Sequence, residues 1–302
     1  MFKMVYFSAM PRPLPIALAQ LPPRPYTHTV ASYAREVETL LSAHPDTRLV
    51  AFPELHLCGV EGSATERNGQ LNAAAQPLEG SRTRELAQLA GDLGVWLAPG
   101  SVCERGDEGQ LFNTALVFSP EGQLAGSYRK IFPWRPYEPY HPGDRFVVAD
   151  LAEFGRIGFS ICYDTWFPEV TRHLAWLGAE LVLNPVQTTT PDRAQELVLA
   201  RANAITNQLF VASVNTAGPV GMGDSILVDP EGAVLGHLPG GTPGVLAQTI
   251  DLDDVARVRR EGTAGFARVW DQFAPDDAPL ELPLYQGRIE PGRWRPQAGG
   301  TR

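Results

Sequence analysis

The sequence predicts an α/β fold with mixed β-sheets. Short apolar runs alternate with amphipathic segments along most of the chain, and this alternation is typical of layered α/β proteins. In two places, at 95–98 with 111–118 and at 225–228 with 245–250, two strand candidates follow one another without a helical pattern between them. Successive strands of this kind indicate mixed sheets rather than a purely parallel one.

The expected strands are short apolar runs bounded by turn residues. They lie at 15–20, 49–52, 95–98, 111–118, 147–151, 155–162, 181–183, 209–214, 225–228 and 245–250. The expected helices, in which apolar residues recur at helical spacing, lie at 29–43, 81–93, 168–177, 191–207 and 251–261.

Particular residues support individual helices. The apolar face of 29–43 is formed by Tyr33, Val37, Leu40 and Leu41, which are spaced as on one side of a helix. Segment 168–177 has proline in its first turn and glycine just beyond its end, the usual helix boundaries. Thr190 is expected to cap the helix 191–207.

We expect a single domain over residues 14–273, because no convincing linker rich in Pro, Gly or Ser divides the chain. Residues 1–13 read as an N-terminal extension, since they lack the apolar stretch and cleavage site of a signal peptide. The tail 274–302 is rich in Pro, Gly and Arg and has no periodicity.

Composition excludes several classes of protein. The chain has 302 residues, is 44% hydrophobic and 20% charged, which is the globular range. With 25 Lys+Arg against 34 Asp+Glu the formal charge is −9, so binding to nucleic acid or an anionic membrane is not expected. No apolar run is long enough to span a bilayer. Three cysteines fit reduced thiols in a cytoplasm better than a disulfide framework.

Several common catalytic motifs are absent. There is no P-loop and no GxGxxG at a strand-to-helix turn, so the phosphate cradle of nucleotide enzymes is missing. Scattered histidines and unpaired cysteines make a zinc site improbable. Segment 158–162 (GFSIC) lacks the second glycine of GxSxG, which counts against a serine hydrolase.

Two segments place charged residues at the ends of apolar runs. Glu54 follows the run 49–52 behind Pro53, where α/β sheets present functional groups; a solvated glutamate is the simpler alternative. Lys130 opens a segment, 130–144, dense in aromatic residues and prolines. Such a segment is a shaped, rigid loop suited to a pocket wall, and the alternative is a surface loop with a solvated lysine.

The third segment contains Cys162, at the end of a strand and shortly before the helix that starts at Pro168. The helix dipole and nearby N–H groups are expected to favour the reactive thiolate. A buried, inert cysteine is the alternative. Cys58 and Cys103 have no comparable setting, and we expect both to be structural core residues.

Together these segments resemble the nitrilase superfamily of carbon–nitrogen hydrolases. The resemblance rests on FPE at 52–54, YRK at 128–130 and CYDTWFPE at 162–169, with further likeness at 200–204 and 223–232. It covers about residues 14–260. It implies a four-layer αββα sandwich with two mixed β-sheets.

The resemblance also implies a catalytic triad of Glu54, Lys130 and Cys162, without a metal or an organic cofactor. The cysteine would attack the poorly electrophilic amide carbon, and Glu54 would transfer protons to the leaving amine and from water. Lys130 and the N–H of Tyr163 would stabilise the oxyanion. Glu138 matches the family's second glutamate, which orients the lysine and the substrate.

Trp134, Trp166 and Gln187 are expected to support the site and bind substrate. Segment 130–143 resembles the aliphatic-amidase and formamidase side of the superfamily. Trp166 replaces a frequent arginine, which favours a neutral or partly apolar substrate, because a carboxylate would require an arginine clamp. Arg135 and Arg172 remain alternatives for that clamp.

We therefore expect a cytoplasmic amidase that acts on a small amide. The resemblance implies a homodimer or larger homo-oligomer, with the tail from Ala274 as a possible dimer arm. Alternative functions are a nitrilase, a hydrolase of N-carbamoyl compounds, a thiol acyltransferase on the same scaffold, and a non-catalytic protein that kept the fold.

Overall fold

A computed structural model describes residues 11–290 of the protein. The chain divides into a compact unit that ends at Val269 and a second unit from Trp270 onward. In the second unit the described residues contain one short 3-10 helix, Leu284–Gly287. The predicted extension 1–13 lies outside the described residues up to residue 10, and Pro13 already belongs to a strand. The part of the predicted tail after residue 290 also lies outside them.

The first sheet has seven strands in the order β13-β1-β2-β3-β5-β4, with β6 paired to β5. Strands β1, β2 and β3 are mutually parallel, whereas β13, β4, β5 and β6 join by antiparallel pairing. Their bounds are β1 Pro13–Gln20, β2 Leu49–Ala51, β3 Trp96–Ala98, β4 Ser101–Arg105, β5 Leu111–Phe118, β6 Leu124–Arg129 and β13 Gly244–Asp251.

The second sheet has six strands in the order β12-β11-β10-β9-β8-β7. Its three central strands, β8 to β10, are parallel and the outer ones antiparallel. Their bounds are β7 Val148–Asp150, β8 Arg156–Phe159, β9 Leu181–Val186, β10 Phe210–Asn215, β11 Ser225–Val228 and β12 Val234–Leu238. The predicted runs 225–228 and 245–250 belong to different sheets, because β12 intervenes and the chain then crosses to β13.

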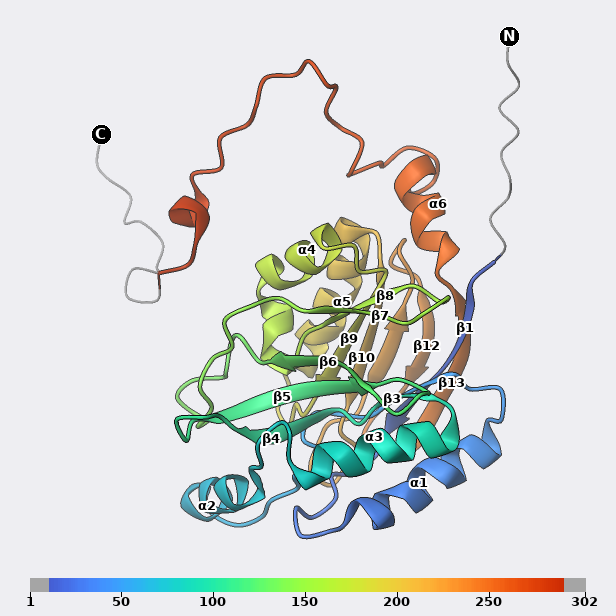
Figure 1. Ribbon diagram of the computed structural model, residues 1–302. Coiled ribbons are helices and arrows are strands. Elements are labelled where there is room, and N and C mark those ends of the chain that lie inside the picture. The colour runs from blue at the N-terminus through green and yellow to red at the C-terminus, as the bar shows by residue number, and fades with distance from the viewer. Residues whose placement is uncertain (1–10, 291–302) are drawn as a thin grey trace. The chain divides into compact units, whose positions relative to one another are not determined.

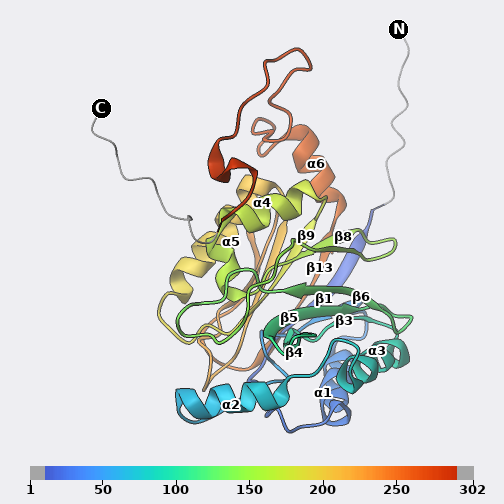
Figure 2. The same ribbon diagram turned by 60° about the vertical axis from the view of Figure 1, so that its left-hand side comes forward.

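Helices cover the outer faces of both sheets (Figure 1). Helices α1 and α3 lie on the first sheet, and α4 and α5 on the second, as the turned view confirms (Figure 2). Their bounds are α1 Val30–Ala43, α2 Ala64–Ala74, α3 Ser81–Leu93, α4 Pro168–Trp176, α5 Arg193–Asn207 and α6 Asp253–Glu261. The resulting αββα layering confirms the predicted fold class. Among residues 11–290, no helix is both long and apolar enough to cross a bilayer.

Two apolar clusters hold these layers together. One lies between the two sheets and includes Leu18, Phe159 and Leu183. The other lies between the first sheet and its helices and includes Tyr33 and Leu86. Because β2 and β9 are buried on both faces, the polar residues at their ends stand on rigid supports.

Three differences from the sequence-based expectation have local causes. The sequence analysis did not predict helix α2, because this helix lacks a strong apolar stripe. A capping box between Ser63 and Glu66 fixes its first turn. Thr190 does not cap α5: the helix begins at Arg193, after Asp192, and the Thr190 hydroxyl bonds the Asp192 carboxylate instead. The strand expected over 155–162 ends at Phe159.

Candidate active site

Glu54 stands three residues beyond the end of β2, in a tight backbone arrangement. A Cβ atom on Gly100, whose φ is +84°, would lie 1.7 Å from the carbonyl oxygen of Pro53, so only glycine allows this approach. The next residue, Leu55, has a left-handed φ of 52° and donates its N–H to the Ser101 hydroxyl at 3.0 Å. The Glu54 side chain is only 2% exposed.

Lys130 directly follows β6, and hydrogen bonds of its backbone N–H and carbonyl groups fix its position. Its N–H bonds the Asn113 carbonyl at 2.9 Å, and its carbonyl accepts the Gly143 N–H at 2.7 Å. A Cβ on Gly143 would lie 2.2 Å from the Arg129 carbonyl oxygen. The loop between Lys130 and Gly143 therefore closes tightly on the lysine, whose side chain is fully buried.

The Lys130 ammonium lies between two carboxylates. Its Nζ is 3.0 Å from Glu54 Oε1 and 2.9 Å from both carboxylate oxygens of Glu138. The Trp134 N–H donates to Glu138 Oε2 at 2.8 Å and holds that carboxylate in place. Burial alone would lower the pKa of Lys130, but the charges of Glu54 and Glu138 outweigh it and raise the pKa well above its usual value. The lysine is therefore a permanent cation.

Asn113 is a member of this cluster that the sequence analysis missed. Its Nδ2 donates to Glu54 Oε1 at 2.8 Å, and the residue is fully buried. It lies in β5, where every residue is buried. The available signal was a polar amide inside an otherwise apolar run, because buried polar groups need a partner.

The Glu54 pKa is raised. Burial is the largest cause and the Glu138 carboxylate adds to it, while Lys130 and a hydrogen bond from the Cys162 thiol act in the opposite direction. A raised carboxyl pKa brings the group closer to neutral pH, where a general base works best.

Cys162 begins a short 3-10 helix, Cys162–Trp166, and has a left-handed φ of 47°. Such strained residues gather at functional sites because the surroundings hold them. Here the holding group is Asp164, which accepts hydrogen bonds from the Tyr128 hydroxyl at 2.7 Å, from the Ile161 N–H at 2.9 Å and from the Phe132 N–H at 2.9 Å. The cysteine is thereby fixed against the loop that follows Lys130.

The expectation that this position favours a thiolate is wrong for the resting site. Burial, followed by the nearby Glu54 carboxylate, raises the pKa of the Cys162 thiol well above its usual value, and Lys130 offsets this only in part. The expected effect of the helix end on the thiol pKa is outweighed by burial, and by a carboxylate that comes from a distant part of the chain. The resting nucleophile candidate is therefore a neutral thiol beside an acceptor for its proton.

The expected pocket residues are placed around this cluster in different ways. Gln187 Nε2 reaches the Glu54 carbonyl at 3.4 Å, and the half-exposed Trp134 ring lies 4.4 Å from that of Tyr137. Tyr163 packs edge-on against Phe167, 5.2 Å between centroids. The indole N–H of Trp166 is buried and has no hydrogen-bond partner among the described residues.

Tyr163 is the second residue of the 3-10 helix. N–H groups in the first turn of a helix have no acceptor within the helix. Its backbone can therefore supply a donor beside the Cys162 thiol.

Cys58 and Cys103 are buried, as expected of core residues. The Cys103 N–H points at Cys58 Sγ, 3.4 Å away. A hydrogen bond from the Cys103 thiol lowers the pKa of Cys58 to about 7, with Arg82 contributing. Burial keeps both thiols away from solvent.

Known proteins share this architecture. The family model described as "Carbon-nitrogen hydrolase" matches residues 15–260. An (R)-stereoselective amidase of Pseudomonas sp is 35% identical over 243 residues, covering 77% of this chain and 84% of that protein. A formamidase of Bradyrhizobium diazoefficiens is 31% identical and covers 78% and 70%.

Solved structures agree. Saccharomyces cerevisiae Nit3, described as a member of branch 10 of the nitrilase superfamily, superposes with a TM-score of 0.72 at 26% identity, covering 82% of this chain and 94% of its own. A mutant of the amidase from Nesterenkonia sp. AN1 superposes with a TM-score of 0.65 at 28% identity, covering 82% and 94%. That structure carries the acetamide moiety of fluoroacetamide added covalently at the active-site cysteine.

Proposed function

Because the chain belongs to the carbon–nitrogen hydrolase family, we propose that it is a cysteine-dependent amidase whose reaction is carried out by Glu54, Lys130 and Cys162. It is a hydrolase of carbon–nitrogen bonds other than peptide bonds, and the proposal concerns its mechanism and substrate. The main support is the fully buried Lys130, held between two carboxylates beside a cysteine. The covalent adduct at the cysteine of the Nesterenkonia amidase supports the same role for Cys162.

Acylation starts from the neutral thiol and the ionised Glu54. Glu54 takes the thiol proton as Cys162 Sγ forms a bond to the amide carbon, and the carbonyl π electrons move to oxygen. Lys130 and the Tyr163 N–H stabilise this oxyanion. As the carbonyl re-forms, Glu54 gives its proton to the nitrogen, the C–N bond breaks, and ammonia or an amine leaves a thioester on Cys162.

Deacylation repeats the same transfers with water. Glu54 removes a proton from water as the hydroxide oxygen bonds to the thioester carbon. When the tetrahedral species collapses, the C–S bond breaks and the sulfur receives the proton from Glu54. The products are a carboxylic acid and the original thiol, so water is the one co-substrate consumed and no change of oxidation state occurs.

Glu138 supports both half-reactions through Lys130. Its bidentate contact, together with the Trp134 N–H, fixes the direction of the ammonium. We propose that the substrate is a small neutral amide bounded by Trp134, Trp166 and Gln187. The buried, unpartnered indole N–H of Trp166 is a hydrogen-bond donor where an arginine would suit a carboxylate.

We further propose that the protein is a homodimer or larger homo-oligomer. Helix α5 carries exposed apolar side chains on its outer side, with Val198 66% and Ile205 42% exposed, and Leu177, directly after α4, is 42% exposed. Val198 and Ile205 share one face of α5. Apolar surface of this kind marks interaction sites. The three free cysteines support a reducing, cytoplasmic environment.

Ammonia release tests the catalytic proposal. Wild type and Cys162→Ala are compared on short aliphatic, aromatic and amino-acid amides, ureido compounds and nitriles. We expect release from neutral amides that disappears in the variant while its melting temperature is kept. Equal release by Cys162→Ala would refute the cysteine mechanism, and release only from nitriles or ureido compounds would refute the substrate class.

A further inference from the structure

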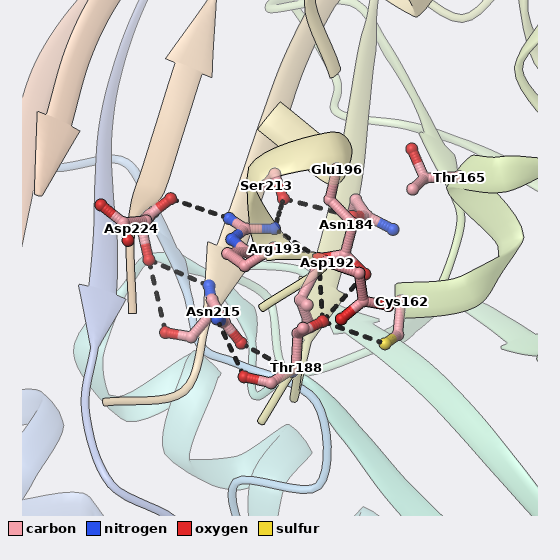
Figure 3. A network of polar contacts seen from close by, with 12 residues as sticks. Cys162, Thr165, Asn184, Thr188, Asp192, Arg193, Glu196, Ser213, Asn215 and Asp224 are labelled. Atoms are coloured by element: carbon pink, nitrogen blue, oxygen red, sulfur yellow. Dashed lines mark hydrogen bonds and ion pairs between the residues drawn. The ribbon is translucent and has the colours of Figure 1, made fainter. Parts of the chain in front are cut away.

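A second buried polar network lies directly behind Cys162 (Figure 3). It joins the loop after β9, the first turn of α5, and strands β10 and β11. The amidase mechanism above does not use its residues.

The centre of this network is a buried ion pair in the first turn of α5. Arg193 Nη1 lies 3.0 Å from Glu196 Oε2, and both side chains are under 5% exposed. Arg193 also donates to the Ser213 hydroxyl at 3.0 Å and to the carbonyls of Gly223 and Asp224 at 3.2 and 2.9 Å. Since an arginine is always charged in a protein, its partner Glu196 is held as a carboxylate.

Thr188 connects this ion pair to the cysteine. Its hydroxyl oxygen lies 2.9 and 2.8 Å from the two oxygens of Glu196 and 3.8 Å from Cys162 Sγ. The Thr188 N–H bonds Asn215 Oδ1 at 2.9 Å, so the residue is fixed from both sides. Figure 3 shows the hydroxyl between the carboxylate and the sulfur.

Hydrogen counting determines the direction of these bonds. A hydroxyl has one proton, and an ionised carboxylate can only accept. The Thr188 proton therefore points to Glu196, and the oxygen presents a lone pair to Cys162. This arrangement offers no donor to a Cys162 thiolate, and it leaves the single thiol proton in its hydrogen bond to Glu54.

We propose that Glu196 is a positioning residue that acts on Cys162 through the Thr188 hydroxyl: it keeps the hydroxyl proton away from the sulfur, so that the thiol keeps its own proton, directed at Glu54, until the attack. This inference rests on the proposed role of Cys162 as nucleophile. Four charged groups from three segments face the thiol: Glu54, Lys130 with Glu138 in the loop after β6, and Glu196. Three of them are carboxylates, and each raises the pKa of the thiol.

A purely structural role is the competing explanation, because Arg193 also ties α5 to β10 and β11. The two roles differ in what they predict for the thiol. In both roles the charge of Glu196 acts directly on the thiol. A structural clamp therefore predicts the same effect on the pH dependence of Cys162 reactivity with or without the Thr188 hydroxyl, whereas a positioning residue predicts a larger effect while Thr188 carries it.

The test measures the rate of iodoacetamide alkylation of the Cys162 peptide against pH by mass spectrometry. Glu196→Gln removes one negative charge and supplies an amide that can donate to Thr188, which frees the hydroxyl to donate to sulfur. We expect the alkylation midpoint to move down by about one pH unit, the low end of the shift caused by a neighbouring like charge. Glu38→Gln removes an exposed charge on α1 and serves as control.

Variants of Thr188 test whether Glu196 acts on Cys162 through the Thr188 hydroxyl. Thr188→Val keeps the side-chain shape and the Arg193–Glu196 pair, and we expect kcat to fall about tenfold because nucleophile misplacement mainly slows the chemical step. Thr188→Ser should restore the rate, whereas Thr189→Val, at an exposed neighbour, should have no effect. In the Thr188→Val background, Glu196→Gln should shift the midpoint much less, which a double-mutant cycle measures.

Two results would overturn the proposal: an unchanged midpoint in folded Glu196→Gln, or the same shift with and without the Thr188 hydroxyl. If Glu196→Gln does not fold, Thr188→Val decides, because wild-type kcat in that variant also overturns it. The alkylation readout needs no substrate, so these results are separate from a failure of the amidase assay.

Discussion

Replacing Lys130 by methionine removes the cation between two buried carboxylates while filling nearly the same space. Glu54 lies 3.0 Å from the ammonium, and Glu138 lies 2.9 Å from it on the other side. The exchange leaves two negative groups facing each other, with Asn113 and the Cys162 thiol as the remaining donors to Glu54. The free energy of unfolding and kcat should therefore both decrease, and each decrease can be measured separately.

The stability loss follows from breaking a buried ion pair. Removing one partner of such a pair costs about 3–5 kcal/mol, because the other charge stays buried and unpaired. For a chain of this size the melting temperature should fall by roughly 5–8 °C, because the entropy of unfolding is about 2.1 cal/mol/K per residue. Arg145→Met is the control: it removes a cation from an ion pair in the same loop whose side chains are 75% and 73% exposed. An exposed pair of this kind contributes little to stability, because water and salt screen its charges.

The loss should depend on pH in a defined direction. The pKa of Glu54 is already raised above the value of 4.5 that it has when unfolded, and without Lys130 it rises further. The folded variant therefore binds more protons than the unfolded chain above pH 4.5, and its stability falls as pH rises through that window. Lys130 itself stays charged throughout, because its pKa is raised. The difference from wild type should be largest near pH 8 and shrink towards pH 5.

Thermal unfolding at pH 5 to 8 measures this difference, and ammonia release measures the catalytic loss. We expect kcat to fall about 10²–10³-fold, as when one oxyanion donor is removed. A variant that melts with wild type at pH 8, or whose deficit is the same at pH 5 and pH 8, would refute the charge reasoning. Normal kcat in a destabilised variant would refute the oxyanion role alone.

The other predictions concern residues around the same cluster and the tail. Asn113→Leu should lower kcat/KM about tenfold and move the acidic limb of the pH–rate profile upward, since a donor to Glu54 is lost; an unmoved limb would contradict this. Gly143→Ala should cost about 1–3 kcal/mol, because its Cβ would lie 2.2 Å from the Arg129 carbonyl oxygen. Gly69→Ala, with no atom within 4 Å of its Cβ, should instead stabilise α2 by about 0.5–1 kcal/mol in denaturant titration. Deleting residues 275–302 should weaken the oligomer in light scattering, and an unchanged mass at low concentration would count against a dimer arm.

The sequence predicted most elements whose residues are buried and apolar. Strand β4 is buried as well, but it was missed because only Val102 and Cys103 among its residues are apolar. Segments 81–93, 111–118 and 225–228 match α3, β5 and β11 residue for residue, because apolar periodicity reports burial directly. Strands β6 and β12 were missed because most of their residues are at least partly exposed. Such strands carry little apolar signal, and their pairing partners determine them.

The residues of the candidate site also fall into two groups: those that a sequence motif indicates, and those that only contacts between distant segments reveal. The motif resemblance placed Glu54, Lys130, Glu138 and Cys162, and the structure brings all four together. It did not identify Asn113, Thr188 or Glu196, because their roles depend on contacts between distant segments. The predicted protonation state of Cys162 was wrong for the same reason. A helix end is visible in the sequence, whereas the burial of the thiol and the Glu54 carboxylate beside it, which together raise its pKa, are not.

The raised thiol pKa agrees with the chemistry once charges are counted over the whole cluster. Glu54, Glu138 and Lys130 together carry one net negative charge while Cys162 is neutral. A preformed thiolate beside an ionised Glu54 would add a second negative charge to a buried site, which is costly. If the proton instead moves from sulfur to Glu54 during attack, the negative charge passes from the carboxylate to the oxyanion and the net charge stays constant. Lys130 faces the charge at both ends of this transfer, so a single fixed cation serves the resting site and the transition state.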